Sequence, residues 1–79
     1  MEFSQRAPEV GATAVYSFDY PGDKPNPSEV KIAEVDARAK TVTVWVHVDV
    51  PRKMIFGFSG ESLSDSEDHQ KFAKLSWPD

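Results

Sequence analysis

The fold of this chain is decided by one ten-residue stretch, Thr41 to Val50, which reads TVTVWVHVDV. Valine occupies every even position, and the odd positions carry Thr, Thr, Trp, His and Asp. Successive side chains of a β-strand point to opposite faces, so a period of two places all of the valines on one face. The stretch therefore predicts a strand whose valine face builds the core and whose other face displays Trp45, His47 and Asp49.

Two further strands are expected before the valine strand. In residues 12–20 small and aromatic side chains alternate with polar ones, so three aromatic rings share one face. Residues 29–36 form the next strand, and the change of parity between Ile32 and Ala33 is typical of a β-bulge. We expect a tight hairpin between this strand and the valine strand, because the Asp36 side chain can cap the turn that connects them.

A turn at Pro51 is expected to follow the valine strand. Proline suits the second position of a turn, and it lacks the N–H that a strand ladder needs. Residues 54–58 then return as a fourth strand, with Met54, Phe56 and Phe58 facing the valines. The alternative is one long strand that is bent at Pro51.

The last third of the chain predicts a helix over residues 65–75. Ser64 and Glu67 have the spacing of a capping box, in which each side chain caps the backbone of the other residue. Acidic residues begin the segment and lysines end it, as the helix dipole favours. A helix this short must pack on the sheet to be stable. Residues 73–77 also alternate as a strand does, and a strand is the alternative there.

These elements predict an α+β fold that is mainly β, namely a four-stranded antiparallel meander with one C-terminal helix packed on it. The alternative is a small five-stranded barrel, which resembles SH3-like and Tudor-like domains in strand number and turn spacing over residues 10–77. The resemblance implies a fold and no function, because no binding motif of those families matches this chain. Residues 1–10 are polar and aperiodic, so we expect a flexible arm followed by a single domain over residues 11–79.

Composition narrows the functional classes. The chain has 79 residues, no cysteine and two histidines, so disulfides and structural zinc are not expected. A net charge of −4 without a long basic stripe argues against nucleic acid and favours a protein partner with a basic surface. The chain has no long apolar run, so neither a membrane span nor a leader is expected. The absence of cysteine favours a cytoplasmic location.

Three stretches are candidates for a partner-binding surface. The first is the polar face of the valine strand, and the second is the proline-rich loop over residues 21–29, which proline stiffens. The third is the acidic, serine-rich stretch over residues 59–68, whose ordinary role is a solvated loop. The candidate residues are Trp45, His47, Asp49, Asp23, Lys24, Asn26, Glu61, Asp65, Glu67 and Asp68.

These features predict a small non-enzymatic interaction protein, a regulator or inhibitor of the kind that phages and mobile elements encode, which docks on another protein. Self-association through an edge strand is expected to add stability. No phosphate-binding loop, nucleophile motif or zinc pattern is present, so neither a cofactor nor an enzymatic activity is expected. Two alternatives are a nucleic-acid-associated domain that uses Trp45, Arg52 and Lys53, and a metal or hydrolytic site begun by His47 and Asp49.

Overall fold

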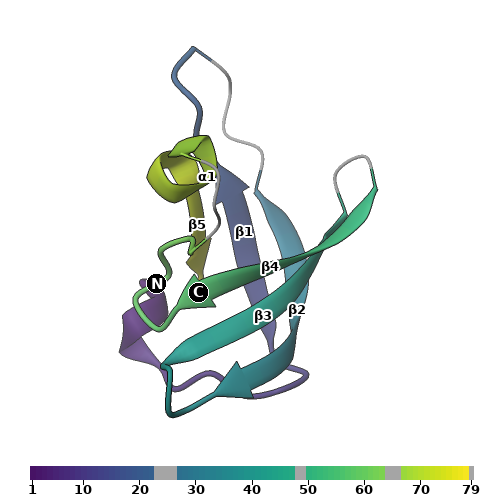
Figure 1. The fold of residues 1–79 in the computed structure, drawn as a ribbon, viewed down its shortest axis with the longest axis vertical. Coiled ribbons are helices and arrows are strands. Elements are labelled where there is room, and N and C mark those ends of the chain that lie inside the picture. The colour runs from purple at the N-terminus through teal and green to yellow at the C-terminus, as the bar shows by residue number, and fades with distance from the viewer. Residues whose placement is uncertain (23–26, 48–49, 64–66, 79) are drawn as a thin grey trace.

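The structure is a computed structural model, and it describes residues 1–22, 27–47, 50–63 and 67–78. Five antiparallel strands form one curled sheet in the order β4-β3-β2-β1-β5, with one short helix before the last strand (Figure 1). The elements are η1 (Phe3–Gln5), β1 (Thr13–Phe18), β2 (Ser28–Asp36), β3 (Thr41–His47), β4 (Pro51–Gly57), α1 (Glu67–Phe72) and β5 (Ala73–Ser76).

The predicted fold class, mainly β with an antiparallel sheet and one short helix, is confirmed. The sheet has five strands, as in the barrel alternative, because the helix ends at Phe72 and residues 73–76 pair with β1. This pairing satisfies backbone groups along the edge of β1 and buries Ala73 and Leu75. The helix α1 is therefore shorter than the predicted range of 65–75 and packs against β1 and β5.

The valine strand forms the centre of the core, as predicted. Val42, Val44 and Val46 are at most 1% exposed and face the buried side chains of the neighbouring strands. Val50 does not continue this buried face, because β3 ends at His47 and Val50 is 59% exposed in the connection to β4. Val48 lies outside the described residues. The buried hydrophobic core consists of Phe3, Ala14, Tyr16, Val30, Ile32, Val42, Val44, Val46, Met54, Phe56, Ala73, Leu75 and Trp77.

The hairpins join the predicted strands, but the expected turn at Pro51 is wrong, because β4 begins at Pro51, which pairs with His47. The register between β2 and β3 shifts between Ile32 and Glu34, which places a bulge where the parity changes. Asp36 caps the turn, because its Oδ1 accepts hydrogen bonds from the backbone N–H groups of Arg38 and Ala39 at 3.0 and 3.1 Å. β3 and β4 form an antiparallel pair with Val46 opposite Arg52, so the alternative of one strand bent at Pro51 is wrong.

The N-terminal segment, for which the sequence predicted a flexible arm, contributes to the core. Phe3 is 1% exposed, and its ring stacks on Trp77 with centroids 4.6 Å apart. The Trp77 indole N–H donates a 3.0 Å hydrogen bond to the Phe3 carbonyl. Glu2 forms a β-bridge with Ser76, so both ends of the chain lie side by side (Figure 1). An apolar phenylalanine within a polar segment is the physical reason, because burying its ring stabilises the folded chain.

A short segment after β4 connects the two edges of the sheet. Ser62 forms a β-bridge with Phe56 of β4, and Glu61 forms one with Lys74 of β5. The Leu63 N–H also donates to the Ile55 carbonyl at 2.9 Å. These bonds cover part of both edge strands and curl the sheet toward a barrel.

Candidate functional site

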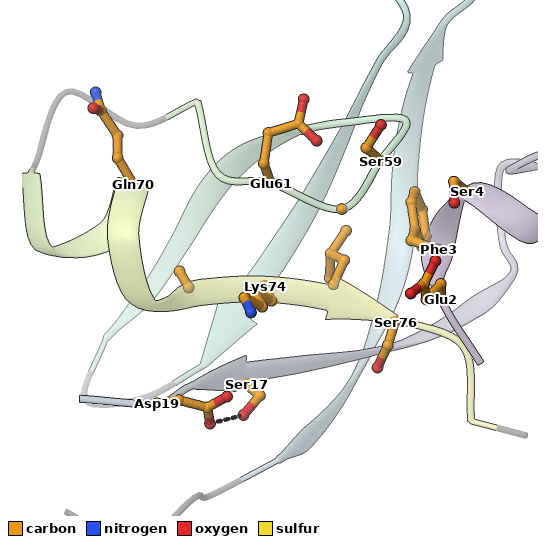
Figure 2. A pocket seen from close by; sticks show the side chains of 13 residues that line it. Glu2, Phe3, Ser4, Ser17, Asp19, Ser59, Glu61, Gln70, Lys74 and Ser76 are labelled. Atoms are coloured by element: carbon orange, nitrogen blue, oxygen red, sulfur yellow. Dashed lines mark hydrogen bonds between the residues drawn. The ribbon is translucent and has the colours of Figure 1, made fainter. Parts of the chain in front are cut away.

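A groove of about 470 Å³ runs along β5 (Figure 2). One side is formed by Ser59 and Glu61 together with the N-terminal segment, and the other side by Ser17 of β1 and by Asp19, which directly follows β1. The lining residues are Glu2, Phe3, Ser4, Ser17, Asp19, Ser59, Gly60, Glu61, Gln70, Ala73, Lys74, Leu75 and Ser76. The groove therefore joins four segments that are far apart in the sequence.

Gly60 allows the segment from Ser59 to Glu61, which forms one side of the groove, to lie directly on β5. Its φ is +89°, and a Cβ atom there would lie 2.5 Å from the Leu75 carbonyl oxygen and 3.1 Å from the Cβ of Phe3. The Leu75 N–H donates to the Gly60 carbonyl at 2.9 Å. Only glycine combines this backbone conformation with so close an approach.

The Glu61 side chain is placed by a second glycine. Its carboxylate lies over Gly57, at a position where a Cβ atom would collide with the carboxylate oxygens. The Gly57 N–H also donates to the Glu61 carbonyl at 2.9 Å. The absence of a side chain at Gly57 therefore lets the carboxylate of Glu61 stay at the rim of the groove.

The groove is acidic and rich in hydrogen-bonding groups. Three carboxylates, from Glu2, Asp19 and Glu61, line it against the single cation of Lys74, so the lining charge is −3 + 1 = −2. The Ser17 hydroxyl donates to Asp19 Oδ1 at 2.5 Å and holds that carboxylate in place. Such a lining suits a cationic ligand, because the carboxylates attract positive charge while hydroxyl and amide groups supply further hydrogen bonds.

The predicted site residues do not form one surface. Glu61 lies in the groove, whereas Glu67 and Asp68 are exposed in the first turn of α1 and are not among the lining residues. Trp45 and His47 are exposed on the far face of β3. The predictions for Asp23, Lys24, Asn26, Asp49 and Asp65 lie outside the described residues.

Sequence reasoning missed the other two groove carboxylates, those of Glu2 and Asp19. Neither residue belongs to the acidic stretch near the C-terminus, and Glu2 was part of the expected arm. The bridge between Glu2 and Ser76 and the pairing of β1 with β5 bring them to the groove. No local signal could have shown this, because both pairings join residues from opposite ends of the chain.

The outer face of the sheet, on β3 and β4, presents apolar side chains to solvent. Trp45 is 42% exposed and Ile55 is 47% exposed. Lys53 lies opposite Trp45, with its Nζ 5.5 Å from the centroid of the indole ring. The helix α1 does not cover this face, because it packs against β1 and β5.

The three residues of the nucleic-acid alternative do not share a face. Trp45 and Lys53 are directly opposite each other, whereas Arg52 precedes Lys53 and therefore points to the other side of β4. There Arg52 lies near Tyr16: burial raises the pKa of the Tyr16 phenol, and the guanidinium partly offsets this rise. The structure thus separates one of the two cations from the exposed indole.

Among the described residues no three histidine, aspartate or glutamate side chains come together as metal ligands. Asp49 and the side chain of His69 lie outside this description, so the metal hypothesis at His47 stays a prediction.

Comparison with known proteins identifies no relative. No protein-family model, no curated protein and no solved structure matches the chain. Within the described part of the chain, no helix has both the length and the apolar character that crossing a bilayer requires.

Proposed function

We propose that this protein is a non-enzymatic interaction module that holds a basic segment of another protein in the groove along β5. The observation that carries this proposal is the set of three carboxylates, from Glu2, Asp19 and Glu61, that line the groove. A basic segment laid along β5 brings its lysine or arginine charges to these carboxylates.

The expected affinity is moderate. Ion pairs on an open surface contribute only about 0–1 kcal/mol each, because water screens them and both side chains lose freedom. Pairs that are partly desolvated in a groove are stronger, and arginine can bind a carboxylate through two hydrogen bonds. A short basic segment is therefore expected to bind with a Kd on the order of 10–100 µM, and a folded partner with further contacts more tightly.

The biological role that fits such a module is regulation or inhibition of the partner in the cytoplasm. The 79-residue chain is acidic, and occupying a basic patch on another protein needs only surface complementarity. The bound basic segment would then be withheld from its other ligands.

Binding of basic peptides tests the proposal. Fluorescence anisotropy with arginine- and lysine-rich peptides is expected to show saturable binding that weakens as salt rises from about 50 to 200 mM. Glu61→Gln and Asp19→Asn are expected to weaken binding about 5- to 10-fold each, because each removes one groove carboxylate while preserving side-chain size.

Glu67→Gln is the matched control, because it removes the same charge from an exposed position outside the groove. Its affinity is expected to equal that of the parent within about 2-fold. Absence of binding to every basic peptide, or an equal loss in Glu67→Gln, would contradict the proposal. A pull-down with mass spectrometry, compared between the parent and Glu61→Gln, then identifies the partner.

A further inference from the structure

We propose that the outer face of β2, β3 and β4 binds a second copy of this chain. In this symmetric dimer, Trp45 of each copy occupies a hollow on the other copy. The inference does not rest on the groove along β5, because the two surfaces share no residue.

The hollow has a volume of about 540 Å³ and lies beside Trp45 on the outer face. It lies over the short side chains of Thr41 and Thr43, between longer ones: Thr43 is opposite Glu34 and Ile55, and Thr41 is opposite Asp36. The hollow is open to solvent, so an aromatic ring of another molecule can reach it. Its principal lining residues are Glu34, Asp36, Arg38, Thr41, Thr43 and Ile55.

Trp45 is the protruding feature that fits this hollow. It follows Thr43 on the same face of β3 and is 42% exposed, although tryptophan gains more than most residues from burial. Lys53 stands beside the indole, so the protrusion combines an aromatic ring with a cation. An exposed tryptophan next to an exposed isoleucine is typical of an interaction surface.

The charges on the outer face of β2, β3 and β4 allow it to bind the same face of a second copy. The hollow carries the carboxylates of Glu34 and Asp36 against the single cation of Arg38, whereas the protrusion carries Lys53. In a two-fold dimer that places each Trp45 over the hollow of the other copy, Lys53 accompanies the indole and comes to the carboxylates of Glu34 and Asp36. The same contact then forms twice, once on each side of the axis, so the assembly stops at two copies, as in most homodimers.

Pairing of two β4 edges is another way in which copies of this chain could associate, and the residues of β4 oppose it. Its first residue, Pro51, has no N–H to donate, and an antiparallel β4 pair centred on Lys53 would bring two lysines together. Proline and lysine at an edge are the usual means by which sheets avoid such pairing. Self-association is therefore assigned to the outer face.

Sedimentation equilibrium tests the dimer. We expect the parent to be monomeric at low micromolar concentration and dimeric toward about 1 mM, with a Kd on the order of 100 µM. Trp45→Ala is expected to weaken the dimer at least about 10-fold. The emission of Trp45 should shift to shorter wavelength as the parent dimerises, whereas Trp77, which is 3% exposed, should not change.

Charge reversal gives the sharper test. Glu34→Lys and Lys53→Glu are each expected to abolish dimerisation, because each places like charges at both contacts. An equimolar mixture of the two variants is expected to form a heterodimer, because every Glu34–Lys53 contact then joins opposite charges again. Lys71→Glu, which changes an exposed lysine on α1, is expected to dimerise like the parent.

A parent that remains monomeric at about 1 mM overturns the proposal, whether or not an unrelated protein binds the face. So does a dimer that Trp45→Ala leaves intact, or a variant mixture that fails to associate while circular dichroism shows both variants folded.

Discussion

Replacing Phe3 by alanine is expected to destabilise the whole domain, although the residue lies three positions from the N-terminus. Its ring is 1% exposed and stacks on Trp77, and its Cβ lies close to Gly60. Truncation leaves a cavity bounded by the indole and by the loop that contacts β5. The Phe3 carbonyl also accepts the Trp77 indole hydrogen bond, and this bond loses its support when the ring is removed.

The expected loss follows from these contacts. Truncation of a fully buried phenylalanine lowers the free energy of unfolding by about 3–5 kcal/mol. A domain of 79 residues has a total stability of roughly 4–12 kcal/mol, so the variant loses a large part of it. A loss of about 4 kcal/mol corresponds to a decrease in Tm of about 15–30 °C for a domain of this size.

Urea unfolding followed by far-UV circular dichroism measures the effect without relying on the fluorescence of Trp77. Val10→Ala is the matched control: it shortens another apolar side chain of the N-terminal segment, which is 66% exposed, and should change stability by less than about 0.5 kcal/mol. If Phe3→Ala loses less than about 1 kcal/mol, the segment is a dispensable arm and the reasoning fails.

Three further predictions concern single positions. Gly60→Ala is expected to lower the free energy of unfolding by more than about 2 kcal/mol, because φ is +89° and the Cβ meets the Leu75 carbonyl; a thermal melt within 2 °C of the parent would contradict this. Asp36→Ala should cost about 1 kcal/mol and Asp36→Asn less, because the turn loses two hydrogen bonds; equal effects on urea midpoints would refute it. Burial raises the pKa of Tyr16 above 10.0, so the unfolded chain loses this proton first. Stability should therefore be insensitive to this group below about pH 10 and fall above it, and Tyr16→Phe should remove that part of the fall in Tm.

The sequence predicted the local structure well, because the forces involved act between near neighbours. Alternation alone placed Val42, Val44 and Val46 in the core, and the parity change after Ile32 marked the bulge. A side chain that bonds its own turn is likewise visible in the sequence, as Asp36 shows. These features need only the geometry of a strand and the reach of one carboxylate.

The end of the chain shows where local reasoning stops. The capping box and the charge pattern predicted a helix to residue 75, and the alternation of residues 73–77 predicted a strand. Both signals were present, and the structure uses them in succession, with α1 ending at Phe72 where β5 begins. Residues 73–76 form a strand and not a longer helix, since pairing with the edge of β1 gives their backbone hydrogen bonds to a neighbouring strand.

By itself, then, the sequence determined the valine strand, its neighbours and the position of Trp45 on the face opposite the valines. Only the tertiary structure brought Phe3 onto Trp77, and Glu2 and Asp19 to the same groove as Glu61. The reason is physical. Contacts between residues as distant as 3 and 77 leave no periodic trace in the sequence, and they form because the curled sheet places both ends of the chain at one edge.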